Sequence, residues 1–209
     1  MTPLLLQFTG AQNTGKSTLV DTLLQKYNGE KIGEISRTMR AQNLISDVDI
    51  NASLLDQIML NSELIYQYYN KILNVADDSL IIAERSPYCC LGYFDNLSSA
   101  VTPAMVDYVH SYLDRFLQAT FASKRVTVVT VFLPVSSEIP FKEDGVRVKA
   151  SQDAVNRSIR SYLLKGNWPD AYAIGSVTLE GRVRQIEDLI EQYKPGLLSK
   201  LKKENKKND

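Results

Sequence analysis

One stretch near the N-terminus, residues 4–18, constrains the fold of this chain more than any other. An apolar run, Leu-Leu-Leu-Gln-Phe, leads into Gly10-Ala11-Gln12-Asn13-Thr14-Gly15-Lys16-Ser17, which has the spacing G-x-x-x-x-G-K-S. Apolar residues then recur at helical spacing from Leu19 to Tyr27. A strand, a glycine-rich loop and a helix in this order predict a phosphate-binding unit, because glycine allows backbone angles and a close approach that a side chain would forbid.

The residue types in this loop predict a site for a nucleoside triphosphate. Successive backbone N–H groups form an anion-binding nest, and the following helix presents its positive N-terminal end to the phosphates. Lys16 is expected to reach the β- and γ-phosphates, and the Ser17 hydroxyl is expected to bind Mg²⁺. We therefore predict ATP and Mg²⁺ as cofactors, with ATP contacted by Gly10, Gln12, Asn13, Thr14, Gly15, Lys16, Ser17 and Thr18.

Composition narrows the class of protein. The chain has 209 residues, 44% hydrophobic and 23% charged, which is ordinary for one globular domain. Its formal net charge is zero, and this argues against nucleic-acid binding, which usually shows a basic excess. The lysine-rich segment 197–209 is expected to be a solvated C-terminal tail.

Cysteine and histidine usage excludes two kinds of site. Cys89 and Cys90 are the only cysteines and have no zinc-ligand spacing, and His110 is the only histidine. A His-rich metal site or a Ser-His-Asp triad is therefore not expected. No signal peptide and no apolar run long enough to span a bilayer is found, so we expect a cytoplasmic protein with no membrane partner.

Short apolar runs alternate with helical patterns along the chain. The pattern predicts strands at about 3–9, 31–36, 80–83, 126–133 and 171–177. Helices are expected up to Tyr27, over 53–75, from Pro103, over 151–165 and from Thr178, whereas 38–52 is expected to be a loop. In the 53–75 helix we expect a broad apolar face of Leu54, Leu55, Ile58, Met59, Ile65, Tyr68, Tyr69, Ile72 and Leu73. This alternation predicts an α/β fold, a three-layer domain over 1–196 with a five-stranded parallel sheet and helices on both faces.

Charged residues follow the predicted strands at their carboxyl ends, where ligands bind in such folds. Glu84 and Arg85 come directly after the buried run 80–83. A carboxylate at the end of the strand beside a phosphate loop normally holds Mg²⁺, so Ser17 and Glu84 are the predicted metal ligands. Arg85 is a candidate for clamping a substrate phosphate or stabilising the transferring group, and a surface ion pair is the alternative.

Two further segments carry candidate residues for a transfer reaction. Glu34 and Arg37 lie at the exit of the second strand, where a carboxylate can take the proton of an attacking hydroxyl. Residues 135–166 have the layout of a helical lid with Arg147, Arg157 and Arg160, and its closure would exclude water and bring arginines to the phosphates. Structural roles without catalysis remain the alternatives for both segments.

Taken together, these motifs make the chain resemble the NadR-like AAA-domain family of small P-loop proteins, which includes the ribosylnicotinamide kinase domain of a bacterial NAD-salvage regulator. The motifs are Gly10–Ser17, Glu34-Ile-Ser-Arg37, Glu84-Arg85-Ser86-Pro87, Asp144-Gly145-Val146-Arg147, and Gly175-Ser176 followed by Arg182. The Glu-Arg-Ser step is also similar to that of deoxynucleoside kinases, with Glu where the NadR-like pattern more often has Asp.

The resemblance implies a P-loop NTPase/kinase fold and a role for each matching residue. Glu34 would be the base or a ligand of the substrate hydroxyl, Arg85 a phosphate ligand, and Arg147 and Arg157 lid residues. Ser176 would lie near the adenine. The predicted catalytic residues are thus Lys16, Glu34, Arg85, Arg147 and Arg157, and the predicted substrate residues are Glu34, Arg37 and Arg85.

The expected function is an ATP-dependent kinase that acts on a nucleoside or small nucleotide, with a ribosylnicotinamide-like acceptor among the candidates. A nucleoside monophosphate kinase and a regulatory nucleotide-binding ATPase without an acceptor are the alternatives. The sequence leaves the acceptor and the oligomeric state open. We expect the acceptor pocket to be built by 38–52, the tyrosine-rich helix and 87–100.

Overall fold

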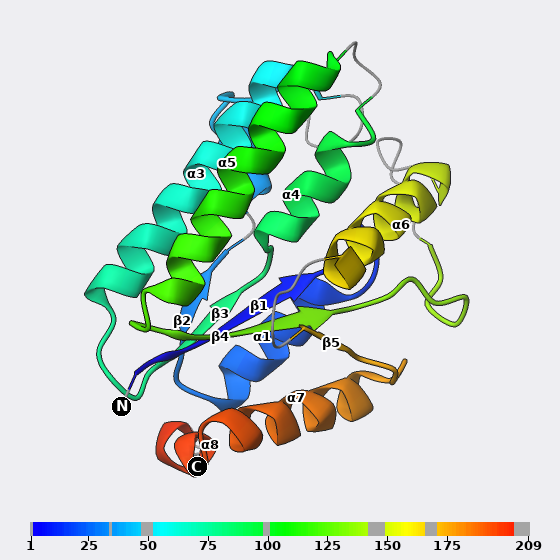
Figure 1. The fold of residues 1–209 in the computed structure, drawn as a ribbon. Coiled ribbons are helices and arrows are strands. Elements are labelled where there is room, and N and C mark those ends of the chain that lie inside the picture. The colour runs from blue at the N-terminus through cyan, green and yellow to red at the C-terminus, as the bar shows by residue number, and fades with distance from the viewer. Residues whose placement is uncertain are drawn as a thin grey trace.

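A parallel five-stranded sheet forms the middle layer of the computed structural model, which describes residues 2–33, 35–46, 52–97, 101–141, 149–165 and 171–202. The strands are β1 (Leu4–Thr9), β2 (Glu30–Ile32), β3 (Leu80–Ala83), β4 (Thr127–Phe132) and β5 (Ala171–Ala173). Their order, β2-β3-β1-β4-β5, places β1 at the centre, and every pairing is parallel (Figure 1). The predicted fold class is confirmed.

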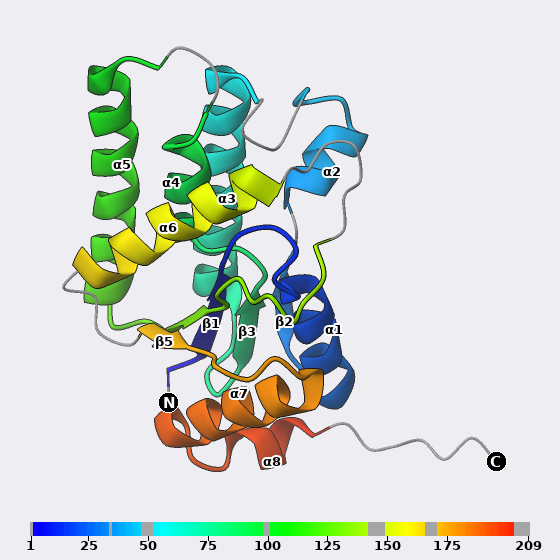
Figure 2. The same ribbon diagram turned by 90° about the vertical axis from the view of Figure 1, so that its right-hand side faces the viewer.

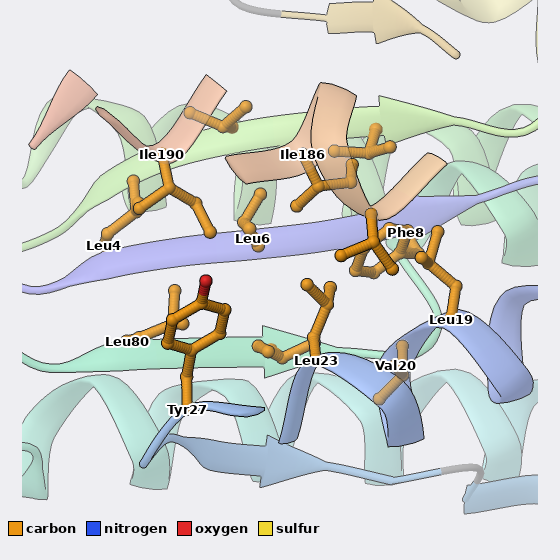
Figure 3. Close-up of a cluster of buried hydrophobic side chains, with 14 of the residues drawn as sticks. Leu4, Leu6, Phe8, Leu19, Val20, Leu23, Tyr27, Leu80, Ile186 and Ile190 are labelled. Carbon is orange, nitrogen blue, oxygen red and sulfur yellow. The ribbon is translucent and has the colours of Figure 1, made fainter. Parts of the chain in front are cut away.

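One face of the sheet is covered by α1 (Lys16–Lys26), α7 (Leu179–Tyr193) and α8 (Leu197–Leu201). Side chains alternate along a strand, so Leu4, Leu6 and Phe8 of β1 all point to this face. They lie in one buried cluster with Leu23 of α1 and Ile186 of α7 (Figure 3). Burial of this layer fixes α1, and with it the loop that precedes α1, against the central strand.

The other face carries α2 (Ile35–Ala41), α3 (Leu54–Asn74), α4 (Pro87–Phe94), α5 (Pro103–Ala122) and α6 (Lys149–Lys165) (Figures 1 and 2). Leu5 of β1 and Ile81 of β3 pack here against residues of α3 and α5. A third cluster joins α4 to α6 through Tyr93, Val155 and Ile159. No helix within the described ranges combines the length and hydrophobicity that a bilayer span requires.

The predicted caps Thr102 and Thr178 are confirmed. Thr102 accepts a hydrogen bond from the Met105 N–H with Pro103 at the first helical position, and Thr178 accepts one from the Gly181 N–H. Ser53 caps α3, and the Asp56 carboxylate accepts from the Ser53 N–H in return. Such caps satisfy N–H groups that have no partner inside the helix.

Four helices differ from the sequence expectations. Helix α2 lies partly in the predicted loop 38–52, and α4 follows β3 directly, with Pro87 opening a helix as well as ending the strand. Helix α6 begins at Lys149, so Ser151 is a buried residue of its first turn and not the predicted cap. Helix α8 lies in the predicted tail, because its two buried leucines complete the cluster around α7.

Candidate functional site

The backbone of the loop 10–17 has the shape that its glycines predict. Gly15 has a φ of 85°, in the left-handed region that favours glycine. At Gly10 a Cβ atom would stand 2.6 Å from the carbonyl oxygen of Leu133, so a side chain does not fit there. Both positions therefore require glycine, one for its conformation and the other for the approach of the chain after β4.

The ammonium group of Lys16 lies inside this loop. Its Nζ donates to the carbonyl oxygens of Gly10 at 2.7 Å and Ala11 at 2.6 Å, and the Thr14 hydroxyl donates to the same Ala11 oxygen at 3.0 Å. Lys16 is also the first residue of α1, so its charge adds to the positive end of that helix. The loop thus gathers positive charge where the sequence predicts phosphates.

The two predicted metal ligands meet at the loop. Ser17 in the first turn of α1 donates a hydrogen bond to Oε1 of Glu84, which follows β3 and is 3% exposed. Lys31 Nζ lies 3.7 Å from Oε2 of Glu84 and 2.7 Å from Oδ1 of Asp21. Burial lowers the pKa of Lys31, but its hydrogen bond to Asp21 and the charge of Glu84 outweigh burial and raise it.

The donor atoms at this position suit Mg²⁺. Hydroxyl and carboxylate oxygens are its preferred ligands, and Mg²⁺ is commonly held by one or two protein groups together with substrate phosphates. In the part of the chain that the structure describes, no group of three or more His, Cys, Asp or Glu residues could hold a metal ion. That Ser17 and Glu84 hold Mg²⁺ together with phosphate oxygens stays a prediction.

Arg85 brings a second cation to the loop. Its guanidinium carbon lies 5.4 Å from the ring centroid of Tyr93, and its carbonyl oxygen accepts a hydrogen bond of 2.7 Å from the Tyr68 hydroxyl. The charges of Lys16 and Arg85 both act on the pKa of the buried Cys89 thiol. Burial raises the pKa of this thiol, but Lys16, a hydrogen bond from Thr9 and Arg85 together lower it. Lys16 and Arg85 thus both favour the charged form of this thiol.

The tip of the loop is joined to the helices of the second face. The Tyr93 hydroxyl of α4 donates to Oε1 of Gln12 at 2.8 Å, and Nε2 of Gln12 donates to the Ser151 hydroxyl of α6 at 2.9 Å. Nε2 of Gln152 donates to the Gln12 carbonyl oxygen at 2.7 Å. Gln12 was predicted to contact ATP, which stays a prediction, and the structure makes it the contact between the loop and two helices.

The opposite side of the loop is held by Arg182 of α7, which is 4% exposed. Its Nη1 donates to the carbonyl oxygen of Thr14 at 2.5 Å and its Nε to that of Ser176 at 2.8 Å. Burial lowers the pKa of this guanidinium. Arg182 thereby fixes the segment around Ser176 beside the phosphate loop, and the predicted position of Ser176 near the adenine stays a prediction.

Other predicted site residues are less closely tied to the loop. Arg37 is exposed on α2, and Thr18 is exposed on α1. Arg157 is exposed on α6. Glu34 and Arg147 lie outside the described residues. The catalytic and substrate roles of these residues stay predictions.

Two amides on α3 are buried, which the hydrophobic pattern of the sequence does not predict. Gln57 is 1% exposed and Asn61 is 3% exposed, and none of their four side-chain oxygen and nitrogen atoms has a hydrogen-bond partner among the described residues. The buried face of α3 is Asp56, Gln57, Leu60, Asn61, Leu64 and Tyr68, whereas Leu55, Ile58, Tyr69 and Leu73 of the predicted apolar face are exposed. The predicted face of this helix was therefore partly wrong, because the amides occupy inward positions.

The strand–loop–helix unit, its lysine and the serine–carboxylate pair at the end of the neighbouring strand define a P-loop protein. A family model of an AAA domain matches residues 6–171. The chain belongs to this AAA domain family, and the resemblance to NadR-like AAA-domain proteins is confirmed.

Solved structures share this fold. NadR in complex with NR has a TM-score of 0.68 and 13% identity, over 91% of this chain and 50% of NadR, so the chain spans about half the length of that protein. Thymidylate kinase from Candida albicans has a TM-score of 0.64 and 15% identity, over 93% of both chains. Deoxyadenosine kinase from M. mycoides has a TM-score of 0.58 and 13% identity, over 91% of this chain and 100% of the kinase. No curated protein sequence matches the chain.

Proposed function

We propose that this protein is an ATP- and Mg²⁺-dependent kinase that phosphorylates a nucleoside or a small nucleotide. One observation carries the proposal: the Lys16 ammonium lies inside the loop that follows β1, and Glu84, which accepts from Ser17, and Arg85 come directly after β3. A site that only binds a triphosphate needs the first two. Arg85, directly after Glu84 in the sequence, adds a cation for the phosphate that an acceptor receives.

We assign the parts of a phosphoryl-transfer site as follows. Lys16 and the loop N–H groups would hold the β- and γ-phosphates, while Arg85 would stabilise charge on the transferring group. The Mg²⁺ ion held by Ser17 and Glu84 would neutralise charge on the phosphate oxygens. Glu34 is proposed to accept the proton of the attacking hydroxyl, and Arg147 and Arg157 to assist from the predicted lid.

The unpartnered amides on α3 support an acceptor with a nucleobase-like edge. Each carboxamide offers an oxygen acceptor and an NH₂ donor, and leaving such groups buried and unpaired costs about 1–3 kcal/mol. Tyr68, which contacts Arg85, lies two turns along the same face of α3 from Asn61, and this spacing corresponds to about 10 Å along the helix axis. That length suits a molecule with its reacting hydroxyl near Arg85 and its base near the amides.

A cavity of about 600 Å³ lies at the N-terminal end of α3, where Asp56 lines it. It is lined by Arg40, Asn43, Leu44, Ile45, Ser46 and Asp56. These residues come from the segment 38–52 and from the tyrosine-rich helix, where the sequence analysis expects the acceptor pocket. The cavity has the volume of an ordinary small-molecule site.

Replacing the amides should separate stability from binding. We expect the Gln57→Leu/Asn61→Leu double variant to unfold at a higher temperature than the wild type, because apolar side chains of similar volume remove two unpaired buried groups. Its acceptor KM should rise at least about tenfold, with the KM for ATP unchanged. Calorimetry and steady-state kinetics measure both effects.

Gln67→Leu is the matched control, since Gln67 is an amide of the same helix whose Nε2 donates to Glu63. It should leave the acceptor KM unchanged. A double variant that is destabilised and retains the wild-type acceptor KM would assign the amides to structure alone.

The proposed function is tested by ATP turnover with a panel of ribonucleosides, deoxynucleosides, their monophosphates and ribosylnicotinamide. We expect a phosphorylated product with at least one nucleoside, detected by mass spectrometry, and a large loss of kcat in Glu34→Gln. Products from monophosphates only, with a mild effect of Glu34→Gln, would support a monophosphate kinase. Tight ATP binding without any product would contradict the proposal and favour a regulatory ATPase.

A further inference from the structure

One tyrosine touches both halves of the proposed transfer site. Tyr93 lies on α4, and its ring centroid stands 5.4 Å from the guanidinium carbon of Arg85. The hydroxyl of the same side chain donates to Oε1 of Gln12 at 2.8 Å. Arg85 belongs to the acceptor side, and Gln12 belongs to the loop that holds the triphosphate.

The surroundings of Tyr93 lock its orientation. The side chain is 4% exposed and packs in the cluster that joins α4 to α6, beside Val155 and Ile159. At Gly92, the preceding residue, a Cβ atom would stand 2.5 Å from Cγ1 of Ile159, so α4 and α6 are in close contact here. The ring therefore has little freedom to leave either Arg85 or Gln12.

Gln12 is held at three points, and Tyr93 supplies one of them. Its Nε2 donates to Ser151 at 2.9 Å, and its carbonyl oxygen accepts from Gln152 at 2.7 Å. The Tyr93 hydroxyl is the partner of the remaining side-chain atom, Oε1. Without this bond the buried amide oxygen would have to turn away from α4, and the tip of the loop would move with it.

We infer that Tyr93 is a positioning residue that holds the loop tip and the acceptor-side Arg85 in a fixed position relative to one another. Its hydroxyl acts through Gln12 on the triphosphate, and its ring acts through Arg85, because an aromatic face attracts and orients a guanidinium group. This inference rests on the proposed function for the meaning of the two sites, but its main test is equilibrium binding of the ATP analogue AMP-PNP with Mg²⁺.

The test is a double-mutant cycle in AMP-PNP binding. We expect Tyr93→Phe, which keeps the ring, to weaken AMP-PNP binding about three- to tenfold, the range for one lost hydrogen bond. Gln12→Met should weaken it by a similar factor, and the double variant should be no weaker than the worse single variant, because the hydroxyl acts through Gln12. Tyr93→Leu, which also removes the ring from Arg85, should lose about a further threefold.

Tyr172→Phe is the control, because the Tyr172 hydroxyl shares a hydrogen bond of 2.6 Å with Tyr193 on the opposite face of the sheet. It should bind AMP-PNP like the wild type at a similar melting temperature. Additive losses of affinity in the cycle, or wild-type affinity of Tyr93→Phe, would overturn the inference for the contact with Gln12. Equal affinities of Tyr93→Phe and Tyr93→Leu would overturn it for the contact with Arg85. These results are independent of whether any acceptor is phosphorylated, so failure of the proposed function remains a separate outcome.

Discussion

A Lys16→Met variant is expected to lose phosphoryl transfer by at least about 10³-fold while it remains folded. Methionine keeps most of the length of the side chain but removes the ammonium group that lies against the Gly10 and Ala11 carbonyl oxygens. The charge that builds up between the β- and γ-phosphates then has no partner inside the loop. Steady-state turnover measures the loss, and circular dichroism checks the fold.

Lys26→Met is the matched control for this variant. Lys26 lies at the other end of the same helix and pairs with Glu187 on the surface, far from the loop. Exposed ion pairs of this kind contribute little to stability, so turnover should stay close to that of the wild type. Equal activity losses in the two variants would show that a general change in α1, and not the Lys16 charge, is responsible.

A Glu84→Gln variant is expected to need about 10- to 100-fold more Mg²⁺ for half-maximal activity. The change keeps the volume of a buried side chain and an acceptor for the Ser17 hydroxyl but removes the negative charge. It also leaves the Lys31 ammonium close to the proposed metal position without a buried counter-charge. Titrations of Mg²⁺, followed both by turnover and by AMP-PNP binding, measure the effect.

Asp21→Asn separates the metal role of Glu84 from its effect on Lys31. Asp21 is the other carboxylate beside Lys31, at 2.7 Å, and it is exposed. This variant should leave the Mg²⁺ requirement nearly unchanged. If Glu84→Gln has the Mg²⁺ curve of the wild type, Glu84 has no part in holding the ion and its contact with Ser17 is structural.

The features that could be predicted from the sequence are local or periodic. The apolar run 80–83 becomes β3, buried over its whole length, as expected for a central parallel strand. Thr102 and Thr178 cap helices because a single side chain and the following turn suffice for that bond. The loop 10–17 is recognisable because glycine, lysine and serine each meet a separate chemical need at a set spacing.

The elements that were missed lack such a pattern. All eight residues of α4 are buried, so this helix has no polar face and therefore no helical period in its sequence. Helix α2 has seven residues, too few for a reliable period. In α3 the polar Gln57 and Asn61 point inward while Leu55 and Tyr69 are exposed, so hydrophobicity by itself selects the wrong face.

The candidate site likewise contains some contacts that could be predicted from the sequence and others that could not. The Ser17–Glu84 pair follows from a rule, since carboxyl ends of parallel strands share one edge of the sheet. The contacts of Gln12 with Tyr93 and of Thr14 with Arg182 follow from no rule of spacing. Tyr93 and Arg182 lie on two helices that are far along the chain from the loop. Their contacts arise only when the layers pack.

Because Arg182 donates to the Thr14 carbonyl oxygen, the conformation of the loop depends on α7, which lies outside its sequence motif. The matched AAA domain region ends at residue 171, before α7 begins at Leu179. A segment cut at that boundary would contain every letter of the phosphate-binding motif but would lack the guanidinium that clamps its backbone. In this protein the phosphate-binding loop therefore needs a residue of α7 to hold its backbone. That helix lies outside both the motif and the matched region.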